Sequence, residues 1–145
     1  MRISIAADHG GVEMKDAIAV HLRGIGHEVD DCGSHGTTSV DYPDFAKAVA
    51  TKVQIGDSAR GILVCGTGQG MCMAANKVPG VRAGVVADTF SAQMIAEHND
   101  ARVLCLGARV VGPSLAIAIV DSYLGAEFEG GRHARRVAKI EAPTS

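Results

Sequence analysis

The stretch VCGTGQGMC (64–72) places Cys65 at the end of an apolar run and three glycines directly after it. Gly66, Gly68 and Gly70 allow a tight loop whose backbone N–H groups converge on one negative oxygen, and a following helix adds the partial positive charge of its amino terminus. Phosphate binding would need the glycines but not the cysteine. A thiol at a helix amino terminus gives up its proton more readily than a free thiol, so this pattern indicates a nucleophile or a general base.

Two kinds of chemistry would use this cysteine. Nucleophilic catalysis needs an activating histidine, which His9 or His98 could supply. Abstraction of a proton from a carbon beside a carbonyl needs an oxyanion hole, and the backbone amides of residues 66–70 fit that role. The alternative without chemistry is a buried, inert thiol before a tight strand-to-helix turn.

Two further motifs carry candidate residues. His98 in EHND (97–100) stands just past a predicted helix, and histidine is the residue type most often used as a general acid, although a helix-end histidine is also a common capping residue. In GGRHARR (130–136), Arg132 and Arg136 are four residues apart and share one helical face. Such a pair can bind a phosphate, or can be an ordinary solvated basic face.

A dinucleotide-binding loop is the main rival for the glycine-rich segment. That motif reads G-x-G-x-x-G with an acidic residue about 20 positions later, and Asp88 would be tolerably placed. The glycines here follow G-x-G-x-G, however, and no Gly-Lys-Ser/Thr follows as in a P-loop. Both nucleotide motifs are therefore disfavoured.

The elements that position these residues follow an alternating pattern. Apolar, strand-like runs are predicted at 3–7, 27–33, 61–65, 82–88 and 102–107. Helical patterns are predicted at 12–26, 41–53, 71–77, 89–99, 113–125 and 130–142. This alternation predicts an α/β fold: a three-layer αβα, Rossmann-like domain with a five-stranded parallel sheet. Ligands of such sheets bind at the carboxyl ends of the strands, so we expect Asp8, Cys65, Asp88 and Arg109 at one edge, together with the acid candidate His98.

Composition narrows the function classes. The 145 residues fit one domain, 1–145, and a net charge of −2 argues against a nucleic-acid surface. No apolar run is long enough for a membrane span and no targeting segment is evident, so we expect a cytoplasmic protein. The four cysteines form no C-x-x-C pair, which argues against a zinc site, and disulfides are not expected in that compartment.

Six segments in register resemble one known family. AADHGG, DYPDFA, CGTGQGMCMAANK, SAQMIAEHND, VLCLGARVVG and FEGGRHARRV, between residue 3 and about residue 141, look like the ribose/galactose phosphate isomerase family. The resemblance implies an aldose–ketose isomerase that interconverts ribose 5-phosphate and ribulose 5-phosphate through a cis-enediolate, without metal or organic cofactor.

The resemblance also implies roles for individual residues. Cys65 matches the general base that moves a proton between C2 and C1, and His98 matches the acid that opens the furanose ring. Asp8 matches a ring-opening and sugar contact, and Thr67 a group that relays or steadies the hydroxyl proton. The substrate-binding residues implied are Asp8, His9, Gly66, Thr67, Gly68, Gln69, Gly70, Asn99, Arg109, Arg132 and Arg136.

Family members are homodimers or dimers of dimers with active sites shared between subunits, so the terminal helix at about 130–141 is expected to pack on a partner. Some members have a glutamate base where Met71 stands, and retention of Cys65 places this chain with the cysteine group. Gln69 and Cys72 differ from the apolar and small hydroxyl residues expected there. These two positions concern the pocket wall, and therefore the choice of sugar and not the type of reaction.

Two other functions stay open at this point. One keeps the chemistry but acts on a six-carbon phosphosugar, allose 6-phosphate or galactose 6-phosphate. The other is a non-catalytic module that binds a phosphosugar or nucleotide. Retention of Cys65, His98 and Asp8 together argues against the second, because binding alone needs none of them in these roles.

Overall fold

The computed structural model describes residues 1–143, in which strands alternate with helices. The strands are β1 (Arg2–Ala7), β2 (Glu28–Asp31), β3 (Arg60–Cys65), β4 (Ala83–Val85) and β5 (Val103–Gly107). The helices are α1 (Val12–Gly24), α2 (Tyr42–Gln54), α3 (Gln69–Ala75), α4 (Thr89–Glu97), α5 (Pro113–Leu124) and α6 (Arg132–Glu141). Neighbouring strands all pair in parallel, in the order β2-β1-β3-β5-β4. The predicted α/β fold with a five-stranded parallel sheet is confirmed.

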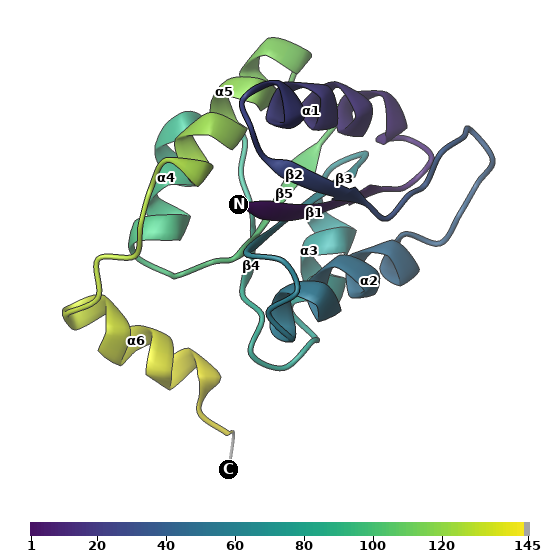
Figure 1. Ribbon diagram of the computed structural model, residues 1–145. Helices are drawn as coiled ribbons and strands as arrows, with labels where there is room; N and C mark the ends of the chain where they lie inside the picture. The colour runs from purple at the N-terminus through teal and green to yellow at the C-terminus, as the bar shows by residue number, and fades with distance from the viewer. Residues whose placement is uncertain (144–145) are drawn as a thin grey trace.

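Helices cover both faces of the sheet (Figure 1). Along β3, Ile62 and Val64 pack in the core beneath α1, α4 and α5, whereas Leu63 and Cys65 pack in the core beneath α2 and α3. The continuous apolar run of this strand is explained by this alternation, because both of its faces are buried. The longest helices have 13 residues, and within residues 1–143 no helix is long and apolar enough to cross a membrane.

The two edge strands are shorter than the sequence predicts. The runs 27–33 and 82–88 form strands only over the four residues of β2 and the three residues of β4. Each edge strand has a single neighbour, so pairing ends as soon as the chain turns away from it. After β4 the chain turns towards Asp88, whose side chain accepts a 2.6 Å hydrogen bond from Ser91 N and caps α4.

The strand order creates one crevice at the carboxyl edge of the sheet. The carboxyl edge is the side of the sheet at which the carboxyl ends of all five strands lie. β1 leads to β2 on one side, whereas its neighbour β3 leads to β4 at the far side. Connections that leave adjacent strands in opposite directions open a binding crevice at the carboxyl ends of those strands. Asp8 follows β1 and Cys65 ends β3, so both lie there.

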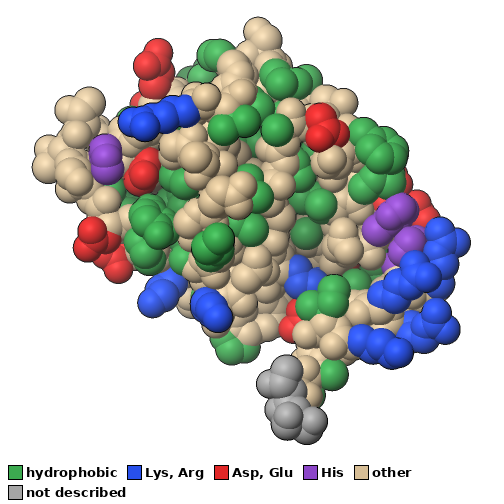
Figure 2. Space-filling model, turned by 180° about the vertical axis from the view of Figure 1, so that it is seen from behind, with side chains coloured by type: hydrophobic (Ala, Val, Ile, Leu, Met, Phe, Trp, Pro, Cys, Tyr) green, Lys and Arg blue, Asp and Glu red, His purple; other side chains and the backbone are tan. Residues whose placement is uncertain are grey.

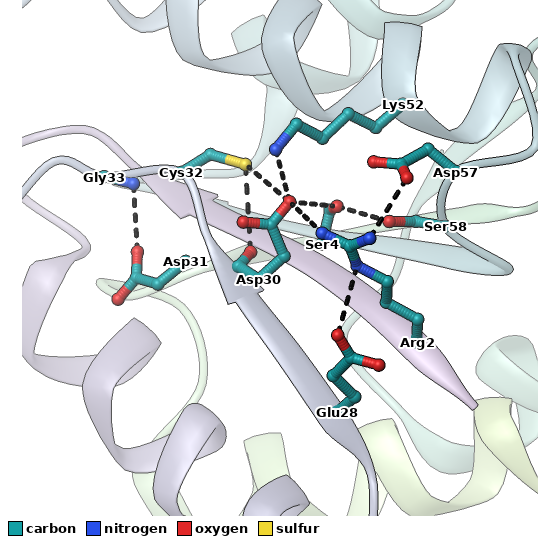
Figure 3. Close-up of polar contacts among 10 residues, drawn as sticks. All are labelled: Arg2, Ser4, Glu28, Asp30, Asp31, Cys32, Gly33, Lys52, Asp57 and Ser58. Carbon is teal, nitrogen blue, oxygen red and sulfur yellow. Dashed lines mark hydrogen bonds and ion pairs between the residues drawn. The ribbon is translucent and has the colours of Figure 1, made fainter.

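Polar residues of β2 attach this edge strand to its neighbours. Asp30 lies among Lys52 of α2, Ser4 of β1 and Arg2, as Figure 3 shows. The hydrogen bond from Lys52 is the main reason that the pKa of Asp30 lies below its usual value. This polar cluster therefore joins α2 to β1 and β2, in addition to the apolar side chains that α2 packs against the same face of the sheet.

The next residue of β2 makes an ion pair on the opposite face. Lys15 of α1 is fully buried, and its Nζ donates to the two carboxylate oxygens of Asp31 at 2.9 and 2.7 Å. Burial alone would raise the pKa of Asp31, but the hydrogen bonds from Lys15 and from Gly33 N outweigh it and lower the pKa. The pair holds α1 against the carboxyl end of β2.

We predict that Lys15→Met destabilises the fold by about 3 kcal/mol, because the partly buried Asp31 carboxylate loses its buried cationic partner. Urea unfolding followed by circular dichroism at fixed protein concentration measures the change. Lys47→Met on α2 is the matched control, because Lys47 is exposed and its loss is expected to cost no more than about 0.5 kcal/mol. Equal unfolding midpoints for the two variants would contradict the role of the pair.

Candidate active site

The loop after β3 binds back onto the sulfur of its own cysteine. Cys65 is only 5% exposed, and its Sγ accepts a hydrogen bond from Gly68 N at 3.1 Å. Gly68 has a φ of +79° and precedes α3, and a Cβ there would lie 2.7 Å from Val85 and 3.0 Å from the backbone of Leu106. Only glycine fits this position. We call residues 65–70 the Cys65 loop.

The amides of the Cys65 loop are not all free. Gly68 N is bonded to Cys65, and Gln69 N donates to Thr67 Oγ1 at 3.3 Å. The oxyanion function that the sequence suggests for residues 66–70 is thus reduced to those amides not already bonded within the loop. Thr67 and Gln69 are exposed, whereas Gly66 and Gly70 are half-buried.

Three of the predicted residues lie beside this loop. Asp8 N donates to Val64 O at 3.1 Å, and its Oδ1 accepts from Gly10 N at 3.0 Å. His9 Nδ1 accepts from Val40 N at 3.3 Å, which ties the segment before α2 to the same edge. Arg109 N donates to Gly66 O at 3.0 Å. The expectation of one shared edge therefore holds for Asp8, His9, the Cys65 loop and Arg109.

A cleft of about 320 Å³ opens next to these residues. The start of α1 and the start of α5 form its walls, with Gly10, Glu13, Ala108 and Pro113 among the lining residues. It adjoins the Asp8 and Arg109 side of the edge rather than the sulfur of Cys65.

Sequence reasoning missed Tyr42 as a residue of this edge. Tyr42 is the first residue of α2, and its phenol ring covers Gly70. A Cβ atom at position 70 would lie only 2.9 Å from the phenol oxygen. Tyr42 is 41% exposed, so part of the ring faces solvent beside the loop. Tyr42 belongs to the DYPDFA segment, which is one of the six family-like segments, and this marked it as a candidate. Nothing in the sequence shows that this segment reaches the Cys65 loop.

Cys72 is a second free thiol close to this loop. It lies on α3 against the same core as Cys65, and a hydrogen bond from Cys105 is the main cause that lowers its pKa to about 7. The Cys105 thiol is fully buried, and its pKa is raised well above the usual value, first by its hydrogen bond to Cys72 and then by burial.

The acid candidate lies at the opposite edge, which corrects the expectation of a single edge for base and acid. His98 follows α4, and α4 runs back to the edge where strands begin: Asn99 O accepts from Arg82 Nε at 2.8 Å, just before β4. Cys65 pairs instead with Gly107 at the end of β5. The five residues of β5 separate the two edges by roughly 15 Å.

His98 does not stand alone at this amino edge. Its ring stacks on that of His133 at the start of α6, with ring centroids 4.1 Å apart and an interplanar angle of 9°. Desolvation is the main cause that lowers the pKa of His133, and the charges of His98 and Arg132 act in the same direction.

The phosphate-binding candidates belong to the same end of the molecule. Arg132 and Arg136 are exposed on α6, which extends away from the layered body (Figure 1). Figure 2 shows Lys and Arg side chains gathered beside two histidines at this end. An ion pair of 2.8 Å between Arg82 and Glu141 ties the end of α6 to the body. The structure thus brings His98, Arg132 and Arg136 to one end, and Cys65, Asp8 and Arg109 to the other.

Comparison with known proteins gives a consistent result. The ribose-5-phosphate isomerase B of Escherichia coli (strain K12) is 48% identical over 97% of this chain and 95% of that protein. The structure of Clostridium thermocellum ribose-5-phosphate isomerase B has a TM-score of 0.96 and 56% identity, over 97% of this chain and 95% of that one. The ribose-5-phosphate isomerase B of Mycoplasma genitalium, solved with bound ribulose 5-phosphate, has a TM-score of 0.92 and 48% identity over 97% and 93% of the two chains.

The sequence model of the ribose/galactose isomerase family matches residues 3–140, which is almost the whole chain. Together with the relatives above, this match shows that the chain is an isomerase and belongs to the ribose/galactose isomerase family.

Proposed function

We propose that the protein interconverts ribose 5-phosphate and ribulose 5-phosphate through a cis-enediolate, with Cys65 as the general base. The observation that carries the proposal is the buried Cys65 sulfur at the head of a glycine loop, at the crevice between β1 and β3. The relative from Mycoplasma genitalium, which holds ribulose 5-phosphate, supports the choice of sugar.

The chemistry needs one proton transfer in each direction. The Cys65 thiolate takes the proton from C2 of the open-chain aldose, and the C2–H electron pair forms the C1–C2 double bond of the enediolate. The same thiol then returns its proton to C1, while the hydroxyl proton moves between O2 and O1 with Thr67 as the adjacent relay. Backbone amides of the Cys65 loop that are free of internal bonds stabilise the enediolate oxygens.

Ring opening and phosphate binding require the other group of residues. His98 donates a proton to the ring oxygen of the furanose, Asn99 contacts the enediolate, and Arg132 and Arg136 bind the phosphate. Asp8 and His9 contact the sugar from the Cys65 side, and Arg109 adds positive charge there.

We propose that a second copy of the chain brings these groups together. The two groups lie at opposite edges of one sheet, so a single chain cannot place both on one five-carbon sugar. α6 extends from the body with its basic face exposed, which suits packing on a partner subunit. A homodimer with two shared sites is the minimal assembly, and a dimer of dimers would preserve them.

The experiment that tests the function is an assay of ribulose 5-phosphate formed from ribose 5-phosphate, with EDTA present and no cofactor added. Turnover is the expected result, and it would support both the pentose substrate and independence of metal. A folded protein without turnover would contradict the pentose assignment and move the test to allose 6-phosphate and galactose 6-phosphate. Failure on those sugars as well would favour the non-catalytic binding module.

We predict that Cys65→Ala lowers kcat by about 10²–10⁴-fold with little effect on KM, because general bases contribute rate factors of that size. Cys72→Ser is the matched control: it removes the neighbouring thiol and leaves the base in place. Circular dichroism checks that both variants fold. A Cys65→Ala enzyme with the parental kcat would overturn the assignment of the base.

Hybrid dimers test the shared site. We predict that a hybrid of one Cys65→Ala subunit and one His98→Asn subunit, isolated with two different affinity tags, recovers about half the parental activity, because one of its two symmetric sites is intact. The two parental variants, each as a homodimer, are the inactive controls. If base and acid belonged to the same chain, both sites of the hybrid would be damaged and no activity would return.

A further inference from the structure

His98, Glu129 and His133 form a cluster whose polar atoms are close but not bonded to one another. Glu129 Oε1 lies 3.9 Å from His98 Nε2, and Oε2 lies 3.7 Å from His133 Nε2. Both distances exceed the length of a hydrogen bond. The carboxylate therefore faces two stacked imidazoles without satisfying either one.

His133 adds to this cluster a buried nitrogen that has no hydrogen-bond partner in the described part of the chain. The residue is only 6% exposed, and its Nε2 has no hydrogen-bond partner within residues 1–143. Buried polar atoms are rarely left unpaired, and each exception calls for an explanation.

We propose that His98, Glu129 and His133 bind a divalent transition-metal ion, with Zn²⁺ as the best match. Two imidazoles and one carboxylate are a common ligand set for zinc with one position left open. The ligand atoms all lie within 4.8 Å of one another, and ligands in a tetrahedral zinc site are about 3.4 Å apart. The half-exposed Glu129 side chain can bring its oxygens a few tenths of an ångström closer to the two histidine nitrogens. The two parallel rings must also tilt so that both nitrogens face one ion.

The backbone already holds the cluster in place. Glu129 N donates to Glu97 O at 3.0 Å, which sets Glu129 beside the last turn of α4 and therefore beside His98. Gly130 and Gly131 then adopt φ values of +67° and +56°, and this turn starts α6 so that His133 returns to the stack. The ligands thus come from three segments fixed to one another before an ion arrives.

Charge makes Glu129 the decisive ligand. Arg132 and Arg136 act on His133 from the same helix and oppose a further cation. Only the Glu129 carboxylate within the cluster offsets that charge. Replacing Glu129 with a neutral residue should therefore weaken metal binding more than the loss of a neutral ligand would.

Occupation of the site would inhibit the enzyme, and this consequence rests on the function proposed above. A nitrogen of His98 that binds the ion has no proton to donate to the sugar ring. The ion is thus an inhibitory ligand and not a cofactor, which agrees with a reaction that needs no metal.

Calorimetric titration with Zn²⁺ tests binding independently of activity. We predict micromolar binding to the chain freed of metal by EDTA, and weakening by about tenfold or more in Glu129→Gln and in His133→Gln, since even outer-shell changes cost metal sites 10–100-fold. The exposed Glu129 can change without loss of the fold, which circular dichroism checks. Absence of micromolar binding would overturn the site.

Cysteine variants separate this site from thiol binding, because zinc also binds thiolates. Cys65→Ala and Cys72→Ser should keep the full affinity, and Co²⁺ in place of Zn²⁺ should show no intense charge-transfer band from a thiolate ligand. Affinity that persists in Glu129→Gln but disappears in Cys72→Ser would place the ion on the thiols and overturn the proposal.

The activity assay gives a separate readout. Zn²⁺ should inhibit ribose 5-phosphate turnover by the parental enzyme, EDTA should restore it, and Glu129→Gln should need about tenfold more Zn²⁺ for the same inhibition. Tight binding at this cluster without inhibition would support the metal site and contradict the role of His98 as the acid. The two proposals can therefore fail separately.

Discussion

A helix that joins two neighbouring parallel strands must run back to the edge where the strands begin. This constraint divides the candidate residues of the isomerase. Cys65 ends β3 at the carboxyl edge, whereas His98 follows α4 and lies at the amino edge. The length of β5 separates them and is fixed by its pairing with β3, so loop motion cannot bring them together. Chemistry that needs both groups on one sugar must therefore take them from two chains.

The two groups also differ in how firmly they are held. Ala108 N donates to Cys65 O and Arg109 N to Gly66 O, so the Cys65 loop is bonded to the loop after β5 as well as to its own sulfur. These bonds fix the backbone of the Cys65 loop within one chain, as an oxyanion site would require of its donors. α6 is attached to the body mainly at its two ends, by the stack of His133 and by Glu141. A partner subunit that packs on α6 would fix this half, which carries the phosphate-binding candidates Arg132 and Arg136.

Sequence patterns could predict the elements that depend on residues close together in the chain. The buried strands, the loop after β3 and the Asp8 turn follow from apolar runs and glycine spacing, and the structure has them where expected. The lengths of β2 and β4 could not be predicted, because they depend on which strands lie at the edges. The partners of Asp30 and Asp31 depend on tertiary packing of α1 and α2. The predicted edge for His98 was wrong, because its position depends on the direction in which α4 runs and not on which strand precedes it.

In the proposed reaction and in the proposed metal site, His98 of the His98, Glu129 and His133 cluster has two roles that compete. A general acid that must reach a sugar ring needs a nitrogen that no neighbour already occupies, and an imidazole with a free nitrogen is also a metal ligand. Stacking on His133 positions the ring and at the same time adds a second donor. Glu129, within 4 Å of both rings, adds the charge that a cation needs. A free nitrogen that would suit His98 to proton transfer would thus also let it bind zinc, and a carboxylate farther from the stack would separate the two properties.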